Sequence, residues 1–81
     1  TLTDRATYLA LQKDLELEIL FEGDAALFNQ YGVMAVNPEN YPEINYEGAK
    51  AFIDYMISDE GQQAIADFKP YGDTLFFPNA N

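Results

Sequence analysis

Three threonines and one arginine crowd into the first seven residues of the chain: Thr1, Thr3, Thr7 and Arg5. Hydroxyl groups and a guanidinium are directional hydrogen-bond donors, and the first turn of a helix adds backbone N–H groups that have no partner within the helix. The helix dipole also favours negative charge at this end. Residues of these types at this spacing can therefore hold an anion, provided that a helix begins among them.

Arg5 is the only arginine in the chain. Near the N-terminus of a helix, a cation loses about 0.3–1 kcal/mol against the helix dipole, so its position calls for a negatively charged partner. One interpretation supplies a bound anion. The other supplies a carboxylate of the protein, either Asp4 or another of the many acidic residues, and leaves Arg5 on a solvated face. Both interpretations stay open at this point.

The sequence offers little for other kinds of chemistry. It has no histidine and no cysteine, which removes the commonest general base, the commonest transition-metal ligand and the thiolate nucleophile. Its single serine, Ser58, precedes acidic residues that are typical of the start of a helix. The carboxylates that could bind calcium or magnesium are Asp4, Asp54, Asp59, Glu60 and Asp67. Their spacing does not match a calcium-binding loop, so we predict no metal site. Because a nucleophile with a matching base is also lacking, we predict no enzyme, and we predict no cofactor.

The charge of the chain excludes further partners. Fourteen acidic residues stand against four basic ones, for a formal net charge of −10. Nucleic acids and anionic membranes bind basic faces, so neither is a predicted partner. No apolar run approaches the ~20 residues that are needed to span a bilayer.

A helix over residues 1–14 is predicted to carry the N-terminal donors. Thr1 or Thr3 is the expected N-cap, because a hydroxyl oxygen can accept from a backbone N–H of the first turn. Asp4 suits the first turn, where a carboxylate complements the helix dipole.

Two more helices are predicted in the second half of the chain, over residues 46–57 and 59–68. Asn45 is the expected N-cap of the first and Ser58 that of the second. Apolar residues recur at helical spacing on the first of them and are expected to pack in a core. These residues are Phe52, Ile53 and Met56.

Two strands are predicted between the first helix and the others. In residues 15–22, apolar residues alternate with glutamates, which is the period of a strand with one apolar face. Residues 31–36 are apolar on both faces, as in a strand that is buried on both sides. The fold class is therefore α/β. Because a buried strand needs neighbours at both edges, we expect a fragment of a larger protein or an intertwined oligomer. The apolar tail at 75–77 is expected to pack against another part of the chain.

Three stretches point to a family: "TLTDRATYLAL", "ILFEGDAALFNQYGVMAVNPE" and "YEGAKAFIDYMISDEGQQAIADFK" followed by "LFFPNA". In order and spacing they resemble the C-terminal third of the tungstate-binding proteins of ABC-type uptake systems, over nearly the whole chain. Many periplasmic solute-binding proteins share the predicted strand "YGVMAVNP" followed by the helical stretch "AKAFIDYMISDEGQQAI". The "TLTDR" and "LFFPNA" stretches resemble the tungstate branch in particular.

The resemblance implies a partial type II periplasmic-binding-protein fold, in which two α/β lobes enclose an oxyanion. In that frame, residues 1–30 belong to the second lobe, and residues 31–38 form the strand that crosses the hinge. Residues 39–81 return to the first lobe with two helices and a tail. The remaining N-terminal lobe is missing from this chain.

The resemblance also implies a function. The chain would be a fragment of a receptor, periplasmic or extracellular and membrane-anchored, that delivers tungstate or molybdate to the membrane permease of an ABC transporter. The residues that match the family's cleft-facing helix are implied oxyanion ligands: Thr3, Arg5, Thr7 and Tyr8, supported by Thr1 and Asp4. In that frame Asp4 would orient Arg5 or supply a cap, and Tyr8 would wall the cleft. The alternative is a small acidic interaction module that forms an intertwined dimer without a ligand.

Overall fold

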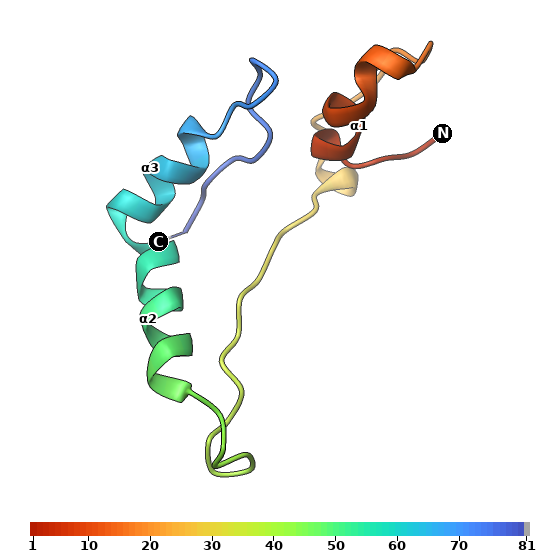
Figure 1. Cartoon of the computed structure of the whole chain (residues 1–81). Coiled ribbons are helices and arrows are strands. Elements are labelled where there is room, and N and C mark those ends of the chain that lie inside the picture. Colours follow the sequence, from red (N-terminus) through yellow and green to blue (C-terminus); the bar gives the residue numbers. More distant parts are fainter. Residues whose placement is uncertain (81) are drawn as a thin grey trace.

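The computed structural model describes residues 1–80, and every regular element in that range is a helix (Figure 1). The segment 39–81, which was predicted to return to the first lobe, ends at Asn81, and Asn81 lies outside the described residues. Among residues 1–80, each helix is too short or too polar to cross a bilayer. The elements in chain order are α1 (Arg5–Leu11), η1 (Gln12–Asp14), η2 (Ala25–Leu27), α2 (Tyr46–Ile57) and α3 (Asp59–Asp67).

The first helix begins later than predicted. Its N-cap is Asp4, whose carboxylate oxygen Oδ2 accepts from the backbone N–H of Thr7 at 3.1 Å. The expectation that Thr1 or Thr3 caps the helix is therefore wrong, whereas the cap from Asp4, one of the two roles that the family resemblance implied for it, is confirmed. The Thr3 hydroxyl instead donates to the Asp4 carbonyl at 3.2 Å, because Thr3 lies one residue too early to reach the first-turn N–H groups. Arg5 consequently becomes the first residue of α1.

The two later helices form as predicted. The Asn45 side chain accepts from the N–H of Gly48 at 2.9 Å and caps α2, and the Ser58 hydroxyl accepts from the N–H of Gly61 at 3.0 Å and caps α3. Phe68, the last residue of the predicted helix, is the C-cap of α3 rather than part of it. Because Ser58 ends one helix and begins the next, α2 and α3 meet at a corner (Figure 1).

Neither predicted strand forms in the described residues. Residues 15–22 and 31–36 carry no strand assignment. The segment 31–36, which was expected to be buried on both sides, instead exposes Met34 at 87% and Val36 at 52%. A strand needs a hydrogen-bonded neighbour, and residues 1–80 supply none to either segment. The predicted α/β class is thus not confirmed.

The core is small and lies at the α1 end of the molecule. It consists of Tyr8 and Leu9 from α1 and Leu75 from the tail. The expectation that the apolar tail packs against another part of the chain is confirmed by Leu75. The apolar stripe of α2 does not reach a core in this chain, since Phe52 is 56% exposed and α2 has no buried residue.

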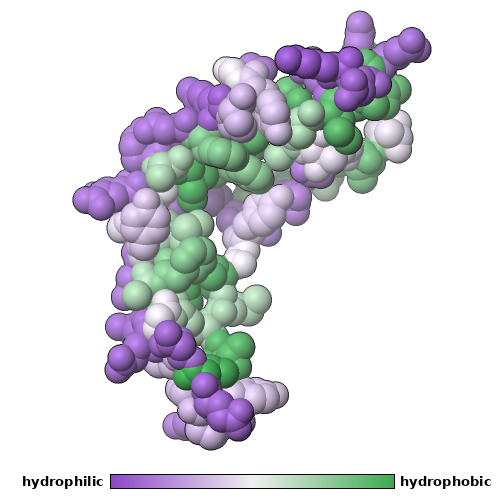
Figure 2. All heavy atoms as spheres, viewed as in Figure 1, coloured by the Kyte–Doolittle hydropathy of each residue, from purple (hydrophilic) through white to green (hydrophobic). Residues whose placement is uncertain are grey.

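The chain is extended for its size. Its radius of gyration is 16.5 Å, whereas a folded domain of this length has about 12 Å. Its accessible surface is 7022 Å², against about 4,900 Å² for a folded monomer of this mass. Figure 2 shows apolar residues gathered along the α2–α3 arm, with hydrophilic residues along its outer border. The chain alone thus leaves apolar surface that a folded protein would normally cover.

Candidate anion-binding site

Arg5 is held by three residues from two parts of the chain: Glu22, and Thr74 and Phe77 of the tail. Its Nε donates to the backbone carbonyl of Thr74 at 2.7 Å. Its Nη1 lies 3.3 Å and 3.2 Å from the two carboxylate oxygens of Glu22, with which it forms an ion pair. Its guanidinium carbon lies 5.8 Å from the ring centroid of Phe77. The Arg5 side chain is therefore only 28% exposed.

The structure pairs Arg5 with a carboxylate of the protein, as the second interpretation of its position expects. The partner is Glu22, while Asp4 caps the helix instead. Within residues 1–80, the second terminal nitrogen of Arg5, Nη2, makes no hydrogen bond. Because a guanidinium carries five N–H donors, Arg5 keeps donors for a further acceptor while Glu22 and Thr74 hold it.

The other residues of the predicted set make different contacts from those of Arg5. Thr1, Thr3 and Thr7 are exposed. The backbone N–H of Thr7 is already taken by the Asp4 carboxylate. The Tyr8 hydroxyl donates to the backbone carbonyl of Leu17 at 2.7 Å, and its ring is buried, so Tyr8 anchors α1 from beneath.

Asp4 places a fixed negative charge at the start of α1. The backbone N–H of Thr7 and, next, its side chain hold the pKa of the Asp4 carboxyl below its ordinary value of 3.8. A hydrogen bond to the charged form stabilises that form, which lowers the pKa. The cap that orders the first turn is therefore an ionised carboxylate at neutral pH.

Asp4→Asn is expected to remove a pH dependence of stability while it keeps the cap. Since the folded pKa of Asp4 is depressed, its charge stabilises the fold fully above pH 3.8, and this contribution is lost as pH falls through the folded pKa. Asparagine also caps helices well, but it does not titrate. Melting temperatures of both proteins from neutral pH down to acid should converge below pH 3.8. A difference that stays constant with pH would contradict this account.

Comparison with known proteins places the chain in a family. Residues 1–60 match the model of the PBP superfamily domain. The chain belongs to the PBP superfamily. That membership supports the predicted periplasmic-binding-protein fold, although the described residues form helices only. No solved structure matches the chain.

Curated relatives of this PBP-superfamily chain align along almost all of it. It is 49% identical, over 99% of its length, to the "Tungstate-binding protein TupA" of Peptoclostridium acidaminophilum. It is 45% identical, over 99%, to the "Putative ABC transporter anion-binding protein" of Haloferax volcanii, and 40% identical, over 98%, to the "Tungstate-binding protein TupA" of Campylobacter jejuni. These alignments cover 29%, 25% and 31% of the relatives, so the chain spans about a quarter to a third of their length.

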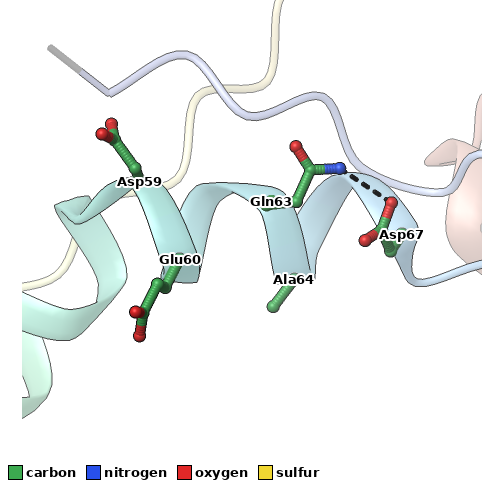
Figure 3. Close-up of a pocket in the computed structure, with 5 residues that line it drawn as sticks. All are labelled: Asp59, Glu60, Gln63, Ala64 and Asp67. Carbon is green, nitrogen blue, oxygen red and sulfur yellow. Dashed lines mark hydrogen bonds between the residues drawn. The ribbon is translucent and has the colours of Figure 1, made fainter.

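The acidic start of α3 does not converge on a second site in this PBP-superfamily chain. Figure 3 shows a shallow pocket along α3 in which Asp59 and Glu60 point away from each other, while Gln63 donates to Asp67 at 2.9 Å. Residues 1–80 hold no group of three or more side chains suited to a metal ion. The acidic residues of the first turn of α3 accompany the Ser58 cap, as their sequence predicts.

Sequence reasoning missed the residues that hold Arg5. Glu22 lies 17 positions away and Thr74 lies 69 positions away, so neither falls within the reach of a helix or turn pattern. Two signals were present but not connected. Glu22 belongs to the alternating acidic stretch, and Phe77 belongs to the tail stretch that resembles the tungstate branch.

Proposed function

We propose that the chain is part of an extracytoplasmic receptor that binds tungstate or molybdate and delivers it to the membrane permease of an ABC transporter. The observation that carries the proposal is the 49% identity, over 99% of the chain, to a protein named for tungstate binding. The match to the PBP superfamily and the second tungstate-binding relative support it. A receptor of this kind catalyses no reaction and needs no cofactor.

In this proposal Arg5, Thr3 and Thr7 donate to the oxyanion at the start of α1, with Thr1 and Asp4 supporting the site. The support is local: Nη2 of Arg5 is without a partner in residues 1–80, and both threonines are exposed. The Thr3 hydroxyl donates to the Asp4 carbonyl and the Thr7 side chain bonds the Asp4 carboxylate, so each hydroxyl must turn from Asp4 to donate to the anion. Tyr8 then forms the floor of the site, since its buried ring and hydroxyl hold α1 in place. The net charge of −10 is no obstacle, because distant surface charges are screened over about 8–10 Å, whereas these donors touch the anion.

The proposed receptor is longer than this chain. In it, residues 1–30 belong to the second lobe, 31–38 cross the hinge and 39–81 return to the first lobe, while a separate N-terminal lobe completes the cleft. Two observations support this division. The chain spans about a quarter to a third of its relatives, and it exposes about 2,100 Å² more surface than a folded monomer of its mass. The strands that the sequence predicts would find their neighbours in the missing part.

The test is a thermal melt of the whole gene product with and without sodium tungstate. A ligand that binds only the folded state stabilises it by RT ln(1 + [L]/Kd), so tungstate at a hundred times Kd adds about 2.7 kcal/mol. We expect tungstate or molybdate to raise the melting temperature, and chloride at the same ionic strength to leave it unchanged. An unchanged melt would overturn the proposal. The intact mass of the gene product, measured on the same sample, tests whether it is longer than 81 residues.

A second function has one observation in its favour. The exposed apolar residues of α2 and of segment 31–36 would suit an acidic module that self-associates as an intertwined dimer. Light scattering on the 81-residue chain distinguishes the two. A folded dimer that does not respond to tungstate favours the module, whereas a monomer or an aggregate favours a cut receptor.

A further inference from the structure

The tail residues Thr74–Phe77 are the part of the sequence pattern that the proposed function leaves unused. We propose that this segment positions the oxyanion site: it fixes the guanidinium of Arg5 so that Nη2 is presented to the anion. The inference rests on the proposed function. It assigns Phe77 and the Thr74 carbonyl as positioning groups, which act on the anion through Arg5 and do not touch it.

The Thr74 carbonyl sets the direction of the guanidinium. Its bond from Arg5 Nε is 2.7 Å long, at the short end of the range for N–H···O bonds. A guanidinium is planar and its five N–H groups have fixed directions. Once Nε–H points at Thr74 and Nη1 at Glu22, the directions of the two N–H groups of Nη2 are also set.

The Phe77 ring supports the face of the same group. It lies 5.8 Å from the guanidinium carbon, within the distance at which a cation is attracted to an aromatic face. Phe77 is 70% exposed, so its ring adds little to the core. The ring of Phe77 is thus free of the core and lies against the guanidinium of Arg5.

The segment that carries these groups is itself well anchored. Leu75 is buried against α1, and the Phe76 ring meets the Tyr31 ring edge-on at 5.7 Å. The side chain of Asn79, two residues beyond Phe77, exchanges two hydrogen bonds with the side chain of Gln30, of 2.8 and 3.2 Å. Thr74 and Phe77 thus hold Arg5 from a segment that is anchored between them, at Leu75 and Phe76, and beyond them, at Asn79.

Such a support favours anion binding because it restricts Arg5 before the anion arrives. A long side chain loses rotamer freedom when it is fixed by a ligand, and a preorganised one loses less. Removal of the aromatic face should therefore weaken anion binding without unfolding the protein. The expected loss is about two- to fivefold in affinity, which is the range of an exposed or partly exposed cation–π contact.

The test compares Phe77→Leu, Phe77→Tyr and Phe28→Leu in the whole gene product by calorimetric titration with sodium tungstate. Phe28 is the matched control, because it is also 70% exposed and contacts no cation in residues 1–80. We expect weaker binding for Phe77→Leu, wild-type affinity for Phe77→Tyr, which keeps the ring face, and wild-type affinity for Phe28→Leu. Melting temperatures without tungstate should match for all four proteins.

Each outcome is decisive. If wild type binds tungstate but Phe77→Leu binds equally well, the positioning role is wrong and the receptor function stands. If Phe77→Tyr binds as weakly as Phe77→Leu, or Phe28→Leu weakens binding to the same extent, the ring face is not the cause and the inference fails. If the wild-type protein itself does not bind tungstate, the proposed function fails first.

Discussion

Replacing Arg5 with glutamine in the whole gene product is expected to weaken tungstate binding by a factor of about 30 or more. The side chain is only 28% exposed, so its bonds to an anion would form largely out of water. Removal of one partner of such a charged hydrogen-bonded pair costs about 2–5 kcal/mol, and each 1.4 kcal/mol is tenfold in affinity. Calorimetric titration with tungstate measures the loss directly.

Lys13→Gln is the matched control for this substitution. It removes one positive charge, as Arg5→Gln does, but from an exposed residue of η1 beyond the first turn of α1. Its effect on tungstate affinity should be within about twofold, because exposed charges are screened by solvent and salt. Equal losses from the two substitutions would mean that only net charge matters, and Arg5 would then not be a ligand.

Glu22→Gln is expected to raise the affinity for tungstate, in contrast to Arg5→Gln. The Glu22 carboxylate bonds Nη1 of Arg5, so its negative charge lies close to the proposed anion. Glutamine keeps an oxygen that can accept from Nη1 but removes the repulsion. Since Glu22 is 57% exposed, the gain should be modest, about three- to tenfold. A loss of affinity would show that the ion pair orients Arg5 more than it repels the anion.

The sequence predicts the elements whose causes are local. Asn45 and Ser58 cap α2 and α3 through hydrogen bonds to residues three positions ahead, and such bonds leave a clear pattern in the sequence. The same reasoning placed the cap of α1 too early. Thr3 and Asp4 are both good capping residues, and the carboxylate rather than the hydroxyl reaches the Thr7 N–H.

The elements that depend on distant partners are not confirmed in residues 1–80. Segments 15–22 and 31–36 have the residue pattern of strands, but residues 1–80 offer them no neighbouring strand. The carboxylate that pairs with Arg5 could not be identified from the sequence for a related reason. Its residue type and position indicated a negatively charged partner, but the choice of Glu22 depends on how the chain returns to α1.

The second large effect is expected at the corner between α2 and α3. A Cβ atom added to Gly61 would clash with the backbone carbonyl oxygen of Tyr55 and would lie 2.9 Å from its carbon. Backbone atoms cannot rotate away as a side chain can, so Gly61→Ala must open the corner. The expected net destabilisation is about 2 kcal/mol, because strain at the upper end of the usual range, about 3 kcal/mol, exceeds the gain of up to about 1 kcal/mol that alanine brings in helix propensity. Urea unfolding of the whole gene product measures it as a lower midpoint.

Two other glycines calibrate the result. Nothing lies within 4 Å of a Cβ added to Gly32, so Gly32→Ala should change stability by less than about 0.5 kcal/mol. The three atoms nearest to a Cβ at Gly48 all belong to the Asn45 side chain, the nearest at 2.7 Å. Because that side chain can move at the cost of its cap, while alanine favours the helix, Gly48→Ala should fall between the other two. If Gly61→Ala were no worse than Gly32→Ala, the tight corner would be wrong.

The corner substitution also separates stability from anion binding. Opening it would disturb the bonds of Ser58 to Tyr55 and Gly61, and the bond of Gln62 to the Met56 carbonyl at 2.7 Å. Among residues 1–80, none of these groups hydrogen-bonds to Arg5. Gln62 also accepts from the backbone N–H of Ala80 at 3.0 Å, but Ala80 lies three residues beyond Phe77, and the tail is held independently by Leu75 against α1 and by Asn79 on Gln30. Gly61→Ala should therefore lower the unfolding midpoint while tungstate affinity, measured below that midpoint, stays within about twofold of wild type. Arg5→Gln should instead weaken tungstate binding and leave the unfolding midpoint nearly unchanged. Arg5 lies at the surface of a small core, and its proposed role is to bind the anion.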